Sequence, residues 1–133
     1  MDGGLEDDPS IAGDTLLYRR VVPRWIVADG NRNCQRLATG AFQGVEMSVG
    51  VGDTLGADPA ESLLEGQPDD VCLVAFEARV AREIDQAVCR APKDDDPAHG
   101  LVVGKKTDAK QRTLARSATW AKAPDDACVP PYE

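Results

Sequence analysis

The chain has 133 residues, of which 42% are hydrophobic and 29% are charged, and its formal net charge is −8. This length suits one domain with a buried core, and the composition excludes an intrinsically disordered chain. No apolar run approaches the ~20 residues of a membrane-spanning helix, so we expect no membrane partner. The negative charge disfavours nucleic acid as a partner. Because the first ten residues, MDGGLEDDPS, lack the apolar centre of a secretory signal, we expect a cytoplasmic protein.

The first part of the chain predicts two strands that are separated by loops. Residues 1–13 are rich in Gly and Asp and predict a flexible lead-in to a single domain over 14–123. Residues 15–22, TLLYRRVV, are rich in β-forming side chains and stop at a proline, which predicts a strand. Turn signals in 23–44 predict loops with short extended pieces, and alternating apolar residues in 46–51 predict a half-buried strand.

The clearest local signal in the chain is a short helix in the segment DPAESLLEG. Asp58 is a favourable N-cap residue, Pro59 occupies the first helical position, and Glu61 lies three residues after the cap. Gly66 supplies the C-terminal stop. These residues predict a short helix between Asp58 and Gly66.

The second part of the chain alternates between apolar runs of strand length and segments with helical spacing. In chain order, the predicted elements are the strand 71–76, the helix 77–84, the strand 86–91, the strand 99–104 and the helix 108–121. Residues 124–133 predict a flexible tail. Together these elements predict an α+β domain, with a mixed or antiparallel sheet of four to six strands and two or three helices.

The four cysteines, Cys34, Cys72, Cys89 and Cys128, show no CxxC pair. We therefore expect no structural zinc site and no other metal. Cys72 and Cys89 lie in apolar strand-like runs, where a thiol behaves as a small hydrophobic group. A disulfide between them would need neighbouring strands, and the expected compartment disfavours it.

The segment PAHGLVVGKKT resembles a phosphate-binding loop only at first sight. Such a loop needs four residues between its glycines, whereas Gly100 and Gly104 are separated by three apolar ones. Lys106 also separates Lys105 from Thr107. Three adjacent apolar side chains predict a strand, so we exclude a phosphate loop.

Two segments of this acidic chain concentrate positive charge. Five arginines lie in residues 18–36 and six cations lie in residues 105–122, each set with a single acid. If the first strand and the last helix pack together, these cations surround a phosphate, a carboxylate or an acidic protein surface. The alternative is two solvated faces that balance the acids elsewhere. The candidate ligand- or partner-binding residues are Arg19, Arg20, Arg24, Lys105, Lys106, Arg112 and Arg116.

His99 is the sole histidine, which excludes a multi-histidine metal site. It is either a general acid or base at the start of a strand or a polar residue that backbone groups satisfy. Ser48 could take part in catalysis, although no GxSxG motif surrounds it. If the protein is an enzyme, its candidate catalytic residues are His99, Ser48 and Arg19.

Four segments, LYRRVVPRWIVADGN, AFQGVEMSV, LVAF and PAHGLVVGKKT, together resemble a set of small bacterial proteins. This resemblance covers residues 15–122 and implies no particular chemistry. Separately, Leu17-Tyr18-Arg19 with the later TGAF and Ser48 is similar to RES-type domains, which are NAD-degrading toxins related to ADP-ribosyltransferases. That similarity implies that Arg19 contacts the dinucleotide and that Ser48 lies in the pocket.

Two hypotheses follow. The first is a non-enzymatic accessory or interaction protein without a cofactor, which binds an acidic partner or an anionic ligand through its cationic surface. Its setting would be a bacterial multi-gene system of the conflict or defence type. The second is a small enzyme that acts on NAD or another anionic substrate. We favour the first because the sequence shows no acid–base constellation and its aromatic content is only 5%.

Overall fold

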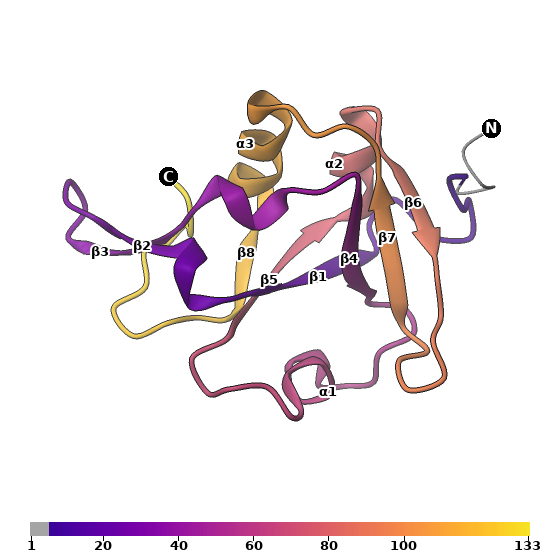
Figure 1. The fold of residues 1–133 in the computed structure, drawn as a ribbon, viewed down its shortest axis with the longest axis horizontal. Helices are drawn as coiled ribbons and strands as arrows, with labels where there is room; N and C mark the ends of the chain where they lie inside the picture. Colours follow the sequence, from indigo (N-terminus) through magenta and orange to yellow (C-terminus); the bar gives the residue numbers. More distant parts are fainter. Residues whose placement is uncertain (1–5) are drawn as a thin grey trace.

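The computed structural model describes residues 6–133, which form a six-stranded sheet, a separate two-stranded sheet and three α-helices (Figure 1). The strands are β1 (Leu16–Val21), β2 (Ile26–Asp29), β3 (Cys34–Leu37), β4 (Glu46–Val51), β5 (Cys72–Glu77), β6 (Ala87–Arg90), β7 (His99–Val103) and β8 (Thr119–Lys122). The helices are α1 (Pro59–Leu64), α2 (Ala78–Glu83) and α3 (Asp108–Ser117), with 3-10 turns η1 (Pro23–Trp25) and η2 (Thr39–Phe42). The larger sheet is antiparallel with the order β6-β7-β4-β1-β5-β8, and β2 pairs with β3. The predicted α+β class is confirmed.

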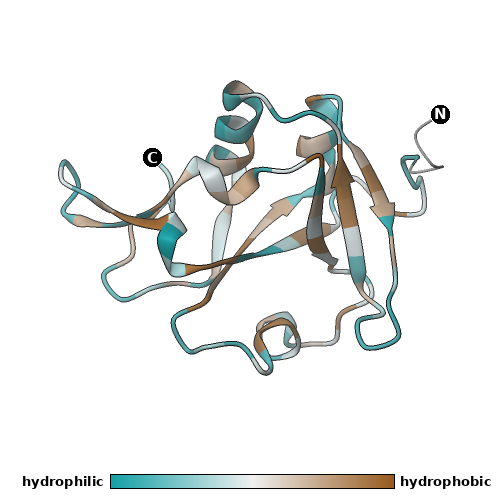
Figure 2. Cartoon of the chain, in the orientation of Figure 1, coloured by the Kyte–Doolittle hydropathy of each residue, from teal (hydrophilic) through white to brown (hydrophobic). Residues whose placement is uncertain are grey.

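Alternate residues of β1 separate the two faces of the larger sheet. Leu17 and Val21 face the hydrophobic core, together with Val51, Val74 and Phe76 of the neighbouring strands. Figure 1 shows α2 and α3 on this core face and α1 on the opposite, outer face. Figure 2 shows apolar residues along the strands, whereas α3 and the loop between β6 and β7 carry mostly hydrophilic ones.

The central strand β1 pairs unequally with its two neighbours. Every residue of β1 has a partner in β5, whereas β4 pairs only with Leu17 and Tyr18. Beyond Tyr18 the strands β1 and β4 diverge, so the backbone hydrogen bonds between them stop. Other donors must then satisfy the carbonyl groups along this opening.

The two helices with the clearest sequence signals form as expected. The Asp58 side chain accepts a hydrogen bond from the Glu61 backbone N–H at 3.1 Å, which caps α1. Gly66 follows α1 with a φ of 76°, a left-handed conformation that suits glycine. In α2, Ala78 and Ala81 are fully buried, and their spacing of three residues places them on one face of the helix.

The predicted helix 108–121 is wrong at its C-terminal end. α3 ends at Ser117, and the chain turns at Ala118 into β8, which pairs with β5. Without β8, the backbone of the buried strand β5 would have no partner along this edge. Thr119 and Trp120 also suit a strand better than a helix, since their side chains are β-branched and aromatic.

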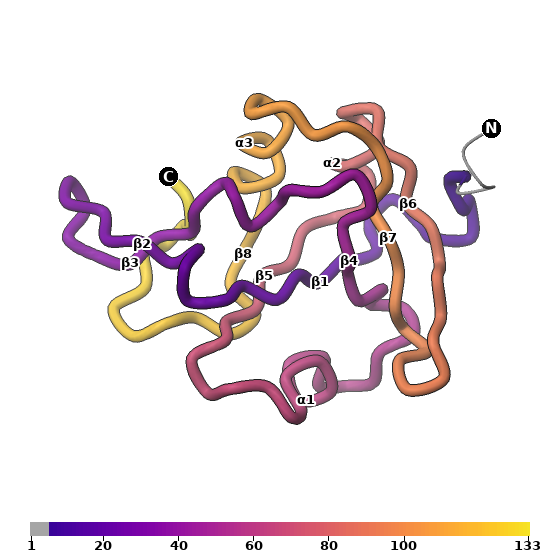
Figure 3. Tube along the Cα trace, in the orientation of Figure 1, coloured from indigo at the N-terminus to yellow at the C-terminus, as the bar shows by residue number. Residues whose placement is uncertain are grey.

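Residues 124–133, which the sequence predicts as a flexible tail, run beside β3 (Figure 3). The Gln35 N–H donates to the Asp126 carbonyl at 2.8 Å, and the Cys128 N–H donates to the Gln35 carbonyl at 2.7 Å. Arg32 adds hydrogen bonds to the carbonyls of Pro130 and Tyr132, each at 2.9 Å. The C-terminal segment thus extends the β2–β3 hairpin.

A disulfide joins Cys34 of β3 to Cys128 of this C-terminal segment. The bond considered from the sequence, between Cys72 and Cys89, does not form. Both residues are buried, but they belong to β5 and β6, which are separated in the sheet by β1, β4 and β7. Burial raises the pKa of the Cys72 thiol.

The N-terminal segment is also tied to the sheet. Of the predicted lead-in, residues 1–5 lie outside the described residues. Ile11 is fully buried in the core, and the Asp8 N–H donates to the Val88 carbonyl of β6 at 2.8 Å.

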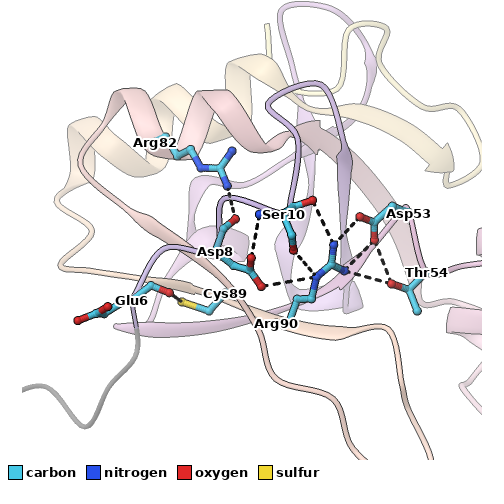
Figure 4. A network of polar contacts seen from close by, with 8 residues as sticks. All are labelled: Glu6, Asp8, Ser10, Asp53, Thr54, Arg82, Cys89 and Arg90. Atoms are coloured by element: carbon cyan, nitrogen blue, oxygen red, sulfur yellow. Dashed lines mark hydrogen bonds and ion pairs between the residues drawn. The ribbon is translucent and has the colours of Figure 1, made fainter.

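Arg90 at the end of β6 connects three segments (Figure 4). Its guanidinium forms two hydrogen bonds with the Asp53 carboxylate, at 2.6 and 2.9 Å, and one with the Ser10 hydroxyl at 3.1 Å. It also contacts Thr54 at 3.2 Å. The Arg90 hydrogen bonds hold the pKa of Asp53 below its usual value. The loop after β4 is thereby held beside β6.

We expect the double substitution Cys34→Ser and Cys128→Ser to lower the free energy of unfolding by about 3–5 kcal/mol, because the disulfide closes a loop between positions 94 residues apart. Urea denaturation followed by tryptophan fluorescence measures this change. Wild-type protein in dithiothreitol should match the double variant. Equal stability of the wild type with and without the reductant would contradict the expectation.

Candidate functional site

The outer face of the sheet carries several of the polar residues that the sequence singles out. Because cross-strand partners share a face, the pairs Tyr18–Gly50 and Gly50–His99 place residues of β1, β4 and β7 side by side. Arg20 and Ser48 lie two positions from Tyr18 and Gly50, and therefore point to the same side. Arg20, Ser48 and His99 thus share one face.

Helix α1 is docked on this face through Leu63. A Cβ at Gly50 would lie 2.9 Å from a Leu63 methyl group, so Leu63 in its present position packs directly on the glycine backbone. Leu63 is buried, and its carbonyl accepts a hydrogen bond from Arg20 Nε at 2.5 Å. This bond fixes the guanidinium of Arg20 at the border between α1 and the sheet.

A groove lies beside α1 and consists of two adjoining hollows that share Arg20, Leu63 and Asp96. The larger hollow, of about 610 Å³, lies between α1 and the loop 93–98. The smaller hollow, of about 50 Å³, lies over the strands. The polar residues that line the two hollows are Tyr18, Arg19, Arg20, Ser48, Thr54, Ser62, Glu65, Gln67, Lys93, Asp95, Asp96 and His99. We call this surface the outer groove.

Ser48 and His99 are in hydrogen-bond contact on the floor of the smaller hollow. His99 Nε2 lies 3.3 Å from Ser48 Oγ, and His99 Nδ1 lies 2.8 Å from the Ala91 carbonyl oxygen. A carbonyl can only accept, so the neutral imidazole carries its proton on Nδ1. The lone pair of Nε2 then faces the Ser48 hydroxyl. Ser48 is exposed and His99 is half-buried.

Arg19 has a different role from its neighbour Arg20. It pairs with Val74 on the core side of the sheet, and its guanidinium lies in the opening between β1 and β4. There it donates to the carbonyls of Ala41 and Ser48, each at 2.9 Å. Burial lowers the pKa of Arg19. Arg19 therefore joins β1 to η2 and to the strand that carries Ser48.

Lys106 is a second cation that lies close enough to Arg19 to be repelled by it. Its Nζ donates to the carbonyls of Gly44, Val102 and Gly104 at 2.7, 2.8 and 3.0 Å. Burial, and then repulsion from Arg19 and Lys110, lower the pKa of Lys106 to about 8. The sequence places Lys106 at an anion site before the last helix, whereas its ammonium group is surrounded by carbonyl oxygens.

The remaining predicted cations do not line the outer groove. Arg116 of α3 forms an ion pair with Glu133 near the C-terminus. Arg24 lies over the ring of Trp25, with its Cζ 5.0 Å from the ring centroid, and Arg19 is 5.5 Å from the same ring. Lys105 and Arg112 are exposed, as are Arg24 and Arg116. The structure therefore brings together Arg20, Ser48 and His99, and separately brings Lys106 near Arg19.

Three features of the site carry no functional signal in the sequence. No sequence signal marks Asp96 as a groove residue, Leu63 is marked only as part of the predicted helix between Asp58 and Gly66, and the Ala91 carbonyl carries no side-chain signal at all. The pairing of β6 with β7 brings Ala91 to His99, through a hydrogen bond from the Ala91 N–H to the His99 carbonyl at 2.9 Å. Only the alternation within EMSVGV, which puts Ser48 opposite the core face, pointed to the groove floor.

Among residues 6–133, no group of three or more His, Cys, Asp or Glu side chains could hold a metal ion. Within the same residues, no helix has the length and apolar character needed to cross a membrane. No family model, curated protein or solved structure matches the chain.

The lowered pKa of Lys106 predicts a stability change at alkaline pH. In the unfolded chain this amine keeps its ordinary value of 10.5, so between about pH 8 and pH 10.5 only the unfolded state holds the proton. The free energy of unfolding should therefore rise with pH over this window by more in the wild type than in Lys106→Met. Urea titrations from pH 7 to 10 measure the slopes. Lys105→Met, at an exposed neighbour, should keep the wild-type slope, and equal slopes in all three proteins would contradict the assignment.

Proposed function

We propose that the protein binds a small polar ligand that carries a carboxylate or phosphate group, and that it does so in the outer groove. The observation that carries this proposal is the placement of Arg20, which borders both hollows and is held by its bond to the Leu63 carbonyl. The bond uses Nε, so the two terminal nitrogens of the guanidinium remain available as anion donors. A guanidinium held in place loses little side-chain entropy on binding.

The size and lining of the outer groove support a small molecule. Ligand sites commonly measure about 300–1,000 Å³, and the larger hollow falls in this range. Lys93 adds a second cation, whereas Glu65, Asp95 and Asp96 supply acceptors. A ligand with one anionic group and several hydroxyl or ammonium donors would match this lining.

A second candidate is the binding of an acidic protein through the Arg24 side of the molecule, as the sequence suggests. The observation that favours it is Trp25, which is half-buried and lies against both Arg19 and Arg24. Trp and Arg dominate the binding energy of many protein interfaces. In this proposal the acidic partner belongs to the same bacterial multi-gene system.

The cytoplasmic location expected from the sequence stays a prediction. The Cys34–Cys128 disulfide weighs against a reducing compartment, because glutathione and thioredoxin keep cytosolic thiols reduced.

Thermal denaturation with a panel of phosphate, nucleotides, NAD and dicarboxylates tests the groove proposal. A ligand present at 100 times its dissociation constant stabilises the folded state by about 2.7 kcal/mol, which raises the melting temperature by several degrees. We expect at least one anionic compound to give this shift with the wild type and with Arg112→Gln, but not with Arg20→Gln. A shift that survives Arg20→Gln and disappears in Arg112→Gln would instead place the anion site on α3.

A further inference from the structure

We infer that Ser48 and His99 form a nucleophile and general-base pair that cleaves a carboxylic ester bound in the outer groove. This inference rests on the proposed function, because the groove and Arg20 hold the substrate. Its basis is the contact between His99 Nε2 and Ser48 Oγ at 3.3 Å, in a hollow that opens to the groove.

The histidine is oriented as a general base requires. A nucleophile and its base need hydrogen-bond contact, and a third group should fix the base. The Ala91 carbonyl does this by accepting from Nδ1 at 2.8 Å. The main chains of Ala91 and His99 are hydrogen-bonded as well, so ring and acceptor are fixed by the same β6–β7 pairing. The carbonyl thus takes the place that a carboxylate has in a Ser-His-Asp triad.

The position of Ser48 suits a nucleophile. Its residue is exposed, in contrast to Met47 and Val49 on either side, which are buried in the core. The Ser48 carbonyl is held by Arg19 at 2.9 Å, so the backbone beneath the hydroxyl is fixed. Arg19 is a positioning residue, since its guanidinium contacts the backbone of Ser48.

The reaction follows from these contacts in two balanced steps. Ser48 Oγ attacks the ester carbonyl carbon while its proton passes to His99 Nε2. The C–O bond to the alcohol then breaks, and the leaving oxygen takes the proton from Nε2. In the second step, a water molecule gives its proton to Nε2 and attacks the acyl carbon, after which Ser48 Oγ leaves with that proton. No redox reagent or metal enters either step.

Arg20 indicates the class of ester. Because Arg20 borders both the small hollow and the larger one, an anionic group on the substrate can rest against it while the ester reaches Ser48. The preferred substrates are therefore esters of dicarboxylic or phosphorylated acids, in preference to uncharged short-chain esters.

A fluorophosphonate probe tests the pair directly. It reacts with an activated serine by forming an O–P bond as fluoride leaves, and mass spectrometry of the intact protein and its peptides locates the label. We expect labelling at Ser48 in the wild type, none at this position in Ser48→Ala, and a rate at least ~100-fold lower in His99→Gln. Ser10→Ala, which removes an exposed serine that contacts Arg90, should label like the wild type. The inference would be overturned if the wild type and His99→Gln were labelled at the same rate. It would also be overturned if labelling of the wild type never exceeded labelling of Ser48→Ala.

Hydrolysis of p-nitrophenyl esters separates this inference from the proposed function. We expect a glutarate monoester to be cleaved at least tenfold faster than the acetate, and this preference to disappear in Arg20→Gln. Melting curves of each variant without ligand show whether it is folded, and Gln at position 99 keeps a donor for the Ala91 carbonyl. Anion-dependent stabilisation without labelling or hydrolysis would leave the binding proposal standing and reject the catalytic pair. Labelling at Ser48 without any anion effect would retain the pair and reject the anionic ligand.

Discussion

The opening between β1 and β4 is the constraint on which the candidate site depends. Backbone pairing between these strands stops after Tyr18, and Arg19 bridges the opening by donating to the carbonyls of Ala41 and Ser48. This single side chain connects the central strand to η2 on the core side and to the strand that carries Ser48. Lys106 donates to three further carbonyls. One is that of Gly44, just before β4, and the others are those of Val102 and Gly104 in and after the neighbouring strand β7. The pairing of β4 with β7 and these two cations together hold β4, which forms part of the floor of the outer groove.

Cations suit this opening better than neutral donors, although their burial has a cost. A guanidinium or ammonium group brings several donors to one point and can satisfy carbonyls that point in different directions. Removing these charges from water is unfavourable, which appears as the lowered pKa of both groups. Because the partners are carbonyl dipoles rather than carboxylates, the positive charge is solvated but not neutralised.

The sequence predicts well those features that local signals determine. The helix after Asp58, the buried alanines of α2 and the alternation in β4 each follow from a cap, a spacing or a period of two. The end of α3 depends instead on β5, whose free edge draws residues 119–122 into a strand. The Cys34–Cys128 bond and the contacts of residues 124–133 depend on β3, which the sequence shows only as a short extended piece.

In the candidate site, too, the features that depend on local sequence can be predicted, and those that depend on distant backbone groups cannot. Alternation along a strand is enough to separate Arg19 from Arg20 and to place Ser48 on the outer face. The partners of these side chains are mostly backbone carbonyls, which every residue carries and no residue type reveals. The sequence therefore indicates one cationic binding surface, whereas Arg19 and Lys106 bind backbone carbonyls within the fold.

Arg20 illustrates how a binding group is built from the same chemistry as a structural one. Both arginines donate to a carbonyl, yet Arg19 places two of its nitrogens on the protein and Arg20 places only Nε, on Leu63. Arg19 reaches one carbonyl on η2 and one on β4, whereas Arg20 reaches the carbonyl of Leu63 in α1, the residue that packs against Gly50. A side chain at position 50 would meet the Leu63 methyl groups, and the Leu63 side chain would have to shift. Because Gly50 and Leu63 both line the smaller hollow, such a shift would alter the surroundings of Ser48 there.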